Sequence, residues 1–566
     1  MPTRVATFGL ALLQGLVLWW LIDAMSDKAW PATDPGLLAA LLTPAVLVPP
    51  LVYLQLGLAR LQVVLVVSAV AVLVLAGFGW HYGARVAPGI GNGYGADAFA
   101  FAIAVIVLCF HALPFLQSAL ETRRARPVYS RLFVFAWRNA LQLALAVVFC
   151  AVLWALLGLW MQLFDMIGIG FFKRLFTDGR FATPLTTVAF AVAIGLAGSV
   201  ERLQQALRQH LLGLFKWLAV LAMLILTLFS VALLAKSPEL FAAGQRAISA
   251  TWLLWLLVAC VYLLNAAYQD GALSAPYPRL VGVAMRVAAP LLVVVALLAA
   301  YALGVRAGAY GLTVARIWAM LVALLLLEYA VGYAIAAWRP GAWMASMGAV
   351  NVVVALTLIG TLTLMLTPIL SPYRLAAASQ GARVLAGSGA NDGYTALALD
   401  AGGYGRRRLA ALAKLEGGAA TAHIRASATA ALELRSRFDR RPASPAVLAL
   451  VAFPEGRTID THLRAAIAIT GAGIGDIQCA SPSTACPVLF VDLNRDGTEE
   501  AVVFTDGRTL LFERKDSLWE PRRLRGEGGL RAAALARLRA GDYRVVAPAW
   551  QALQVGEEHL VVDPGS

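Results

Sequence analysis

The chain has 566 residues, of which 60% are hydrophobic and only 14% are charged, and its formal net charge is +14. Soluble domains carry about 25% charged residues, so this balance is that of a membrane protein. Much of the arginine excess falls in connections between apolar runs, where positive charge sets orientation in the membrane. The composition therefore excludes nucleic acid as a partner and indicates the lipid bilayer instead.

Eleven apolar runs are long enough to cross a bilayer, since about 20 residues at 1.5 Å each span ~30 Å of hydrocarbon. They begin near Val5, Leu37, Leu61, Ala98, Leu141, Leu185, Leu211, Thr251, Val287, Ile317 and Ala349. The first run, residues 5–22, is longer than the core of a cleavable signal peptide, so we expect a retained span. The pattern predicts a polytopic α-helical membrane bundle over residues 1–370.

Positive charge in the loops predicts the orientation of these spans. Residues 121–131, after the fourth span, hold four arginines, and short connections of this kind stay in the cytoplasm. The N-terminus is then cytoplasmic, and an odd number of spans puts the chain after Leu370 on the opposite side. We expect the inner membrane of a two-membrane bacterium, with a periplasmic C-terminal domain.

Two connections are more apolar than ordinary loops. Residues 127–139 place Val128, Leu132, Phe135 and Asn139 on one helical face, which predicts an interfacial helix leading into the fifth span. Residues 165–181, after that span, are too short and too interrupted by glycines to form another membrane-spanning helix. This segment is expected to lie along or dip into the outer surface, either as a mouth or lid or as a packed structural collar.

The polar last third begins at Ser371-Pro-Tyr-Arg374. Residues 371–445 read as a helical lead-in with short helices at 375–385 and 406–416, followed by a Pro/Arg linker at 435–445. Residues 446–566 read as a small α/β or mostly β domain. Its predicted strands, from short apolar or β-branched runs, are residues 447–453, 465–470, 488–493, 500–505 and 509–513.

Between two of these strands, oxygen donors occupy alternate positions. They are Asp492, Asn494, Asp496, Thr498 and Glu500. Calcium loops need such a spacing and a glycine at the sixth position, which is Gly497 here. An EF-hand is excluded because position twelve is Val503 and no helices flank the loop. The loop is similar to the aspartate-rich loops of FG-GAP or VCBS repeats, which predicts a calcium site; a metal-free Asx/Gly hairpin is the alternative.

Cys479 and Cys486 lie together just before this loop. A zinc site would need two more ligands, and His462 alone does not complete a set. In an oxidising compartment the spacing favours a small disulfide-closed loop, with two free thiols as the alternative.

Glu328 is the most centrally placed acid within a span, the tenth. A carboxylate facing lipid is costly, so we expect it to face the bundle and to be paired or protonated. Polar residues of other spans that could meet it are His111, Arg138, Lys216, Asn265 and Asn351. The two interpretations are a structural interhelical hydrogen bond and a transport or proton-relay site.

Several aromatic and glycine patterns resemble a bacterial multi-spanning family known as domain of unknown function 4153. They are residues 154–160, 163–164, 167–169, 171–172, 175–176, 310–313, Arg316, Trp318, 379–383, 399–400 and 403–406. The resemblance implies an inner-membrane protein with an outward C-terminal domain. It implies no activity, cofactor or catalytic residue.

The sequence therefore predicts a non-enzymatic envelope protein whose periplasmic domain binds a partner or ligand while the bundle anchors it or transmits a signal. One alternative is a secondary transporter with a polar path around Glu328. The other is a membrane transferase acting on lipid-linked substrates, which would need a groove lined by Asp165, Lys173 and Arg174. No catalytic residues are assigned, and calcium is the one cofactor that the sequence indicates.

Overall fold

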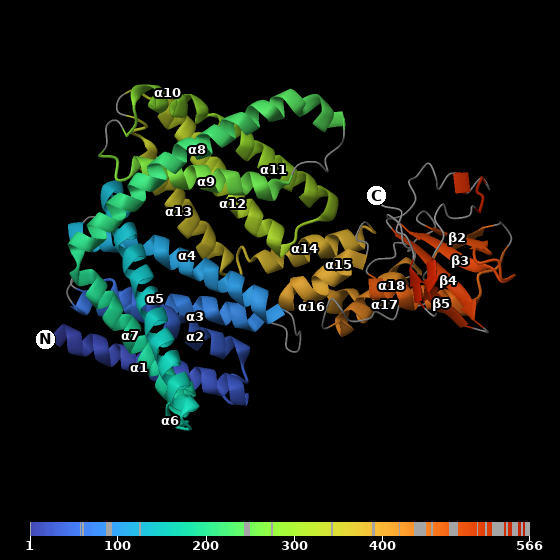
Figure 1. Ribbon diagram of the computed structural model, residues 1–566, viewed down its shortest axis with the longest axis horizontal. Coiled ribbons are helices and arrows are strands. Elements are labelled where there is room, and N and C mark those ends of the chain that lie inside the picture. The colour runs from blue at the N-terminus through green and yellow to red at the C-terminus, as the bar shows by residue number, and fades with distance from the viewer. Residues whose placement is uncertain are drawn as a thin grey trace.

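The computed structural model describes residues 2–56, 58, 61–85, 93–123, 126–242, 249–272, 276–340, 343–387, 391–417, 419–434, 449–453, 457–474, 485–505, 508–515, 518–522, 537–538, 542–545, 553–555 and 558–560. A helical bundle makes up the first two thirds of the chain (Figure 1). A group of shorter helices follows it, and a small sheet domain ends the chain.

Within these residues, eleven segments are long and apolar enough to cross a membrane, as predicted. The protein is therefore a multi-pass membrane protein. The segments are α1 (Pro2–Asp27), α2 (Pro35–Tyr53), α3 (Leu61–Arg85), α4 (Gly93–Thr122), α5 (Tyr129–Met166), α7 (Gly179–Ser199), α8 (Glu201–Ala242), α9 (Ala250–Tyr268), α10 (Arg279–Ala288) together with α11 (Leu291–Tyr310), α12 (Val314–Trp338) and α13 (Met347–Met365).

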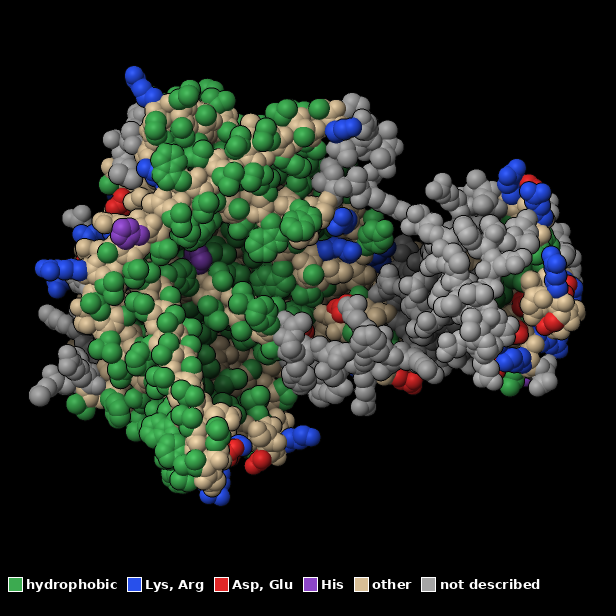
Figure 2. Space-filling model, viewed as in Figure 1, with side chains coloured by type: hydrophobic (Ala, Val, Ile, Leu, Met, Phe, Trp, Pro, Cys, Tyr) green, Lys and Arg blue, Asp and Glu red, His purple; other side chains and the backbone are tan. Residues whose placement is uncertain are grey.

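Apolar and charged side chains are distributed on the surface of the bundle as a lipid environment requires. Hydrophobic side chains cover its middle on the face shown in Figure 2, and charged side chains gather toward its edges. Large apolar residues are widely exposed, including Leu73 (74%) and Trp252 (77%). In water such a surface would aggregate, whereas in hydrocarbon it is fully solvated.

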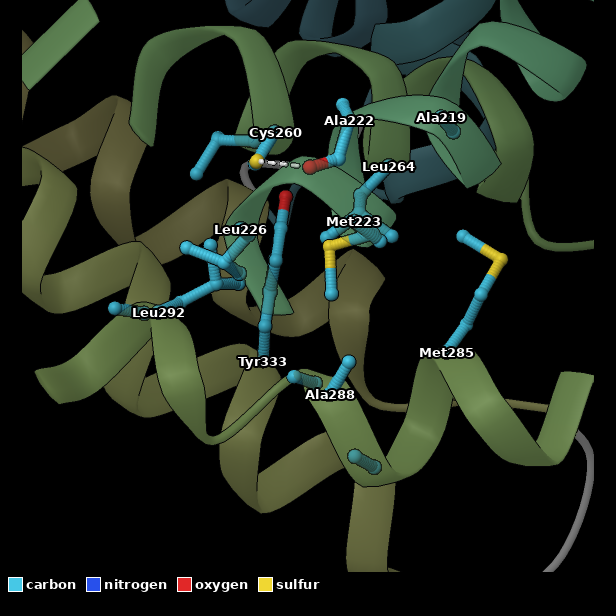
Figure 3. Packing of buried hydrophobic residues seen from close by; sticks show 14 of the residues in the cluster. Ala219, Ala222, Met223, Leu226, Cys260, Leu264, Met285, Ala288, Leu292 and Tyr333 are labelled. Atoms are coloured by element: carbon cyan, nitrogen blue, oxygen red, sulfur yellow. Dashed lines mark hydrogen bonds between the residues drawn. The ribbon is translucent and has the colours of Figure 1, made fainter. Parts of the chain in front are cut away.

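The largest core cluster lies where α8, α9, α11 and α12 meet (Figure 3). Tyr333, Leu257 and Leu292 are fully buried there. The Cys260 thiol donates to the carbonyl oxygen of Ala222 at 3.6 Å, so this cysteine is a packing residue as its apolar setting predicts.

Small residues let α2 and α3 approach closely. A Cβ atom built on Gly79 would lie 2.2 Å from the carbonyl oxygen of Ala39, and one on Gly83 would lie 2.0 Å from that of Pro35. Helices in lipid gain little from the hydrophobic effect between them, so association depends on van der Waals contact of this kind.

The segment predicted as an interfacial helix, residues 127–139, is instead the first part of α5, a single helix of 38 residues. Leu132, Phe135 and Asn139 are buried as the predicted face requires, but they face other helices. Asn139 and Gln117 on α4 exchange two hydrogen bonds, of 2.8 and 3.2 Å. This amide pair holds the segment in line with the span, so it forms no separate interfacial element.

The apolar segment after the fifth span contains a short helix, α6 (Phe171–Thr177). Phe172 packs among four rings, with centroid distances of 5.1 Å to Trp160, 4.7 Å to Phe164, 5.3 Å to Phe171 and 6.0 Å to Phe176. Such mutual packing favours the structural collar over an open mouth.

The lead-in after the last span is a packed unit of helices. It comprises α14 (Pro372–Leu385), α15 (Asn391–Thr395), a π-helical turn η1 (Ala396–Asp400), α16 (Gly402–Leu412) and α17 (Ala419–Glu433). Leu397 and Leu409 are completely buried in its own core, together with Ala428. The predicted helices at 375–385 and 406–416 correspond to α14 and α16, and the predicted linker at 435–445 lies outside the described residues.

The C-terminal domain contains a five-stranded sheet in the order β1-β2-β3-β4-β5, as the predicted α/β class requires. The strands are β1 (Leu450–Phe453), β2 (Cys486–Val491), β3 (Glu500–Thr505), β4 (Arg508–Lys515) and β5 (Leu518–Arg522); a separate pair is β6 (Leu553–Val555) and β7 (Glu558–Leu560). β1 and β2 are parallel and the other neighbours antiparallel. α18 (Thr461–Ile474) connects the parallel pair and covers one face of the sheet.

The predicted strand at 465–470 is wrong, because these residues lie inside α18. A short alternating apolar run fits a strand or a helix equally, and the capping residue decides here. The Asp460 carboxylate accepts the backbone N–H of Leu463 at 2.6 Å and the indole N–H of Trp519 at 3.1 Å. Asp460 thus caps the N-terminus of α18 and connects this helix to Trp519 of β5.

We expect Gly79→Ala to lower the free energy of unfolding by about 1–3 kcal/mol, because its methyl group would overlap the backbone of α2. Gly77, on the same helix, has nothing within 4 Å of its Cβ position and provides the control. Gly77→Ala should be neutral or stabilising by up to ~1 kcal/mol. Thermal unfolding in detergent measures both, and equal effects of the two substitutions would contradict the close approach.

Candidate functional sites

The aspartate-rich segment forms the hairpin loop between β2 and β3, where Val491 pairs with Glu500. Asp492 accepts two backbone N–H groups, from Arg495 at 2.6 Å and Gly497 at 3.0 Å. Left-handed backbone at Arg495 (φ 64°) and Gly497 (φ 86°) turns the loop inward. The loop is therefore preformed by its own Asx turns.

Three carboxylates of the loop converge. One oxygen from each of Asp492, Asp496 and Glu500 lies within 4.8 Å of the others. A calcium ion bound at 2.3–2.6 Å separates opposite ligands by about that distance, so the donor set fits the ion. Glu500 is only 4% exposed, and its Oε2 accepts the backbone N–H of Leu493 at 2.6 Å.

The loop also stabilises the ionised form of Asp496. The backbone N–H of Thr498 and the side-chain amide of Asn494 both donate to this carboxylate, at 2.7 and 2.8 Å, and they lower its pKa. Asn494 and Thr498 are thus engaged within the loop, where the sequence predicts them as ligands. Among the described residues, no lysine or arginine pairs with the three converging carboxylates.

Cys486 begins β2 and is 4% exposed. Cys479 lies outside the described residues, so the disulfide between these two cysteines stays a prediction.

Glu328 lies at the edge of the lipid-facing stripe of α12. Leu324, Val331 and Ile335, one or two turns away on the same side, are 45%, 41% and 52% exposed. The Glu328 side chain is partly buried, and its Oε2 is buried without a hydrogen-bond partner. Among the described residues, Glu328 Oε2 thus lacks the interhelical hydrogen bond expected from the sequence.

The polar residues proposed as neighbours of Glu328 have other partners. Asn351 accepts from the Tyr333 hydroxyl at 2.7 Å and donates to Asn265 at 2.6 Å. His111 contacts the carbonyl oxygen of Val107, and Arg138 contacts the ring of Phe135. Lys216 contacts the rings of Trp217 and Tyr277. The spans thus contain a polar network, but Glu328 is not bonded to it.

Of the three residues named for the transferase alternative, Asp165 lies at the end of α5, and Lys173 and Arg174 lie in α6. Asp165 and Lys173 form an exposed ion pair of 2.9 Å beside the aromatic collar. An exposed ion pair of this kind assigns no reaction, so the transferase alternative stays a prediction.

The structure reveals a further site, which sequence reasoning missed, where α14 leaves the last span. We call it the junction pocket. It is a small cavity of about 10 Å³, room for about one water molecule, and is lined by Phe78, His81, Tyr82, Arg85, Phe101, Trp318, Met365, Leu366, Ser371, Pro372 and Tyr373. The pocket therefore lies between the ends of four spans, α3, α4, α12 and α13, and the first turn of the lead-in.

Arg85 is the charged centre of this junction and is 7% exposed. Its guanidinium carbon lies 3.4 Å from the centroid of the Tyr373 ring and 4.9 Å from that of Tyr82. Asp97 and Arg85 both act electrostatically on the Tyr373 hydroxyl, whose pKa is raised chiefly by burial. The signal in the sequence was the pair His81 and Arg85, one helical turn apart at the end of a span.

Three buried polar atoms line the junction pocket without a hydrogen-bond partner: His81 Nε2, Trp318 Nε1 and Ser371 Oγ. Natural proteins rarely leave such groups unsatisfied, because each costs about 1–3 kcal/mol. Three in one pocket indicate that something polar completes it.

Comparison with known protein families matches none of them to this chain, and no curated protein or solved structure matches it either. The similarities to domain of unknown function 4153 and to FG-GAP loops therefore stay predictions.

We expect Glu328→Leu to leave the free energy of unfolding unchanged or to raise it by about 1 kcal/mol, since it removes a buried oxygen that has no partner. The matched control is Asn351→Leu, which breaks two hydrogen bonds and should cost about 1–3 kcal/mol. Thermal unfolding in detergent measures both. A larger loss for Glu328→Leu than for Asn351→Leu would favour a functional partner of Glu328 and the transport interpretation.

Proposed function

We propose that this protein is a non-enzymatic protein of the bacterial inner membrane that holds a ligand- or partner-binding domain in a defined position over the periplasmic surface. The N-terminus is cytoplasmic and the C-terminal domain periplasmic in this proposal. The arginine-rich connection after the fourth span and the odd number of spans support that orientation.

The observation that carries the proposal is the hydrogen-bonded attachment of the lead-in to the bundle. Gln380 on α14 is 4% exposed, and its amide donates to the carbonyl oxygens of Tyr310 and Leu312 at 3.1 and 2.9 Å. The backbone N–H of Leu312 donates to the Ser379 hydroxyl at 2.9 Å. These bonds fix α14 to the turn between α11 and α12.

If the lead-in only tethered the C-terminal domain to the bundle, it would not need a packed core. Flexible linkers are rich in glycine and serine and have no core of their own. Here Arg406 of α16 also bonds to the carbonyl oxygen of Leu432 at 2.6 Å, which joins the later helices to each other. A unit of this kind can position a domain or pass a displacement between the domain and the bundle.

Complementation of a strain that lacks the protein tests this function. The full chain should correct whatever envelope defect the loss of the protein causes. Residues 1–387 alone and a secreted 446–566 fragment should not correct it. An alkaline phosphatase fused after Arg383 should be active if this end is periplasmic. Full rescue by residues 1–387 would overturn the proposal in favour of transport through the bundle.

The hairpin loop at Asp492 is proposed to bind calcium with an affinity of roughly 10⁻⁴–10⁻³ M, as extracellular modules do. At ten times that concentration, binding should stabilise the loop by about 1.4 kcal/mol. Hydrogen exchange of the full chain should therefore slow over residues 491–504 in calcium relative to chelator.

The double variant Asp492→Ala, Asp496→Ala should lose this protection. Glu499→Ala provides the control, since Glu499 belongs to the same loop but pairs with Arg457 outside the cluster. Identical exchange in calcium and in chelator for the unaltered protein would leave a metal-free hairpin as the correct interpretation.

A further inference from the structure

Four cationic side chains gather at the end of the bundle opposite the lead-in. They belong to α8, to α10 and to the residue that follows α12. We call this set the basic rim, and it consists of Lys216, Arg279, Arg286 and Arg339. Arg279 begins one membrane-spanning segment and Arg339 follows the end of the next, so both lie where the chain passes between water and hydrocarbon. In Figure 1, α10 and α14 lie toward opposite ends of the bundle.

Arg286 holds α10 against the end of α12. Its Nε donates to the carbonyl oxygen of Ala337 at 2.6 Å, and a terminal nitrogen donates to that of Arg339 at 3.3 Å. These two bonds use only part of the donors of a guanidinium. The charge of Arg286 is therefore fixed beside Arg339, with donors left for a ligand.

Lys216 joins the rim from α8. The Tyr277 hydroxyl donates to the carbonyl oxygen of Lys216 at 2.6 Å, and the Lys216 ammonium lies 5.5 Å from the centroid of the Tyr277 ring. Tyr277 packs on Trp343 at 5.6 Å, and the Trp343 indole donates to the carbonyl oxygen of Gly282 on α10 at 3.4 Å. These contacts fix Lys216 beside the first turn of α10, where Arg279 lies.

The basic rim has no paired counter-charge. In the part of the chain that the structure describes, none of its four cations forms an ion pair. The adjoining connections, residues 269–278 and 339–346, contain a single acid, Asp270. Its carboxylate accepts the backbone N–H of Ala272 at 3.1 Å and lies near Tyr129 and Tyr268. Because like charges at one surface repel one another, the rim favours an anionic ligand.

An exposed apolar strip on α10 lies directly beside the two arginines of this helix. Leu280, Val283 and Val287 are 83%, 58% and 60% exposed, and their spacing puts them on one helical face. Arg279 and Arg286 are two helical turns apart, so they line one edge of this strip. A soluble anion would have no use for such a strip, whereas the acyl chain of a lipid would cover it.

Exposed indoles place the rim at the depth of lipid headgroups. Trp217 follows Lys216 and is 55% exposed, and Trp338 precedes Arg339 and is 70% exposed. Tryptophan is enriched at the boundary between hydrocarbon and water. Basic sites between membrane-spanning helices at this depth bind anionic headgroups. The charge, the apolar strip and the depth therefore agree on one class of ligand.

We propose that the basic rim binds the headgroup of an anionic phospholipid, whose acyl chain lies along the exposed face of α10. Arg279 and Arg339 contact the phosphate from the water side. Arg286 and Lys216, which are held by their contacts with α12 and Tyr277, contact it from the bundle. This site goes beyond the proposed role of the C-terminal domain, because it lies at the other end of the bundle.

The test uses the full chain, purified in an uncharged detergent and freed of lipid. Binding is measured by native mass spectrometry and by the shift of the unfolding temperature. The three probes are phosphatidylglycerol, phosphatidylethanolamine with the same acyl chains, and inorganic phosphate. We expect phosphatidylglycerol to bind, phosphatidylethanolamine to bind at least about tenfold more weakly because its headgroup has no net charge, and inorganic phosphate not to bind.

The double variant Arg279→Gln, Arg339→Gln should weaken binding of phosphatidylglycerol about 30-fold, since one arginine near an anionic surface contributes roughly fivefold. Both side chains are exposed and neither forms an ion pair within the described residues, so the unfolding temperature without lipid should stay the same. The matched control is Arg202→Gln, Arg208→Gln, which removes the same charge from exposed positions of α8 outside the rim. It should bind phosphatidylglycerol as the unaltered protein does.

Three results would each contradict the proposal. Equal binding of the two phospholipids would mean that only the apolar strip attracts lipid. Binding of inorganic phosphate as tight as that of phosphatidylglycerol would identify a site for soluble anions. Equal losses in the rim variant and in its control would mean that the lipid responds to the net charge of the protein and not to the rim.

Discussion

The stack of the Arg85 guanidinium on the Tyr373 ring joins the two parts of this protein. Arg85 ends α3, a membrane-spanning helix, and Tyr373 lies in the first turn of the lead-in. A desolvated cation over an aromatic face contributes about 2 kcal/mol or more. The contact also has a steric side, because a Cβ atom on Gly402 would lie 2.9 Å from the carbonyl oxygen of Arg85. Two separate segments of the lead-in thus pack on one turn of α3.

Around this turn of α3, three buried polar atoms have no hydrogen-bond partner among the described residues: His81 Nε2, Trp318 Nε1 and Ser371 Oγ. Elsewhere in the bundle, buried amides have hydrogen-bond partners. The side-chain amides of Gln117 and Asn139 bond to each other, as do those of Asn265 and Asn351. Ser371 and Trp318 have no such partner. A membrane protein can leave a group of this kind open where water or a headgroup is within reach, and the exit of the last span is such a place.

Glu328 and the Asp492 loop illustrate how differently an acid behaves in the two environments. In α12 a single carboxylate faces apolar neighbours without a hydrogen bond, so nothing in its surroundings assigns it a role. In the hairpin, several backbone N–H groups orient the carboxylates toward one another. As a result, one oxygen of each of the three carboxylates lies within 4.8 Å of the others.

The sequence alone determined the class of this protein and the positions of its spans, since a run of about 20 apolar residues has few alternatives to a membrane helix. It also determined β3 and β4, which are short runs of apolar and β-branched residues. It did not determine α18, because a six-residue alternating run fits either period until the capping of Asp460 is known. Nor did it identify the junction pocket. His81, Trp318 and Ser371 are far apart in the chain, and each looks ordinary in its own segment. Only tertiary packing brings them together and withholds other partners from them, which is why the structure was needed to recognise the site.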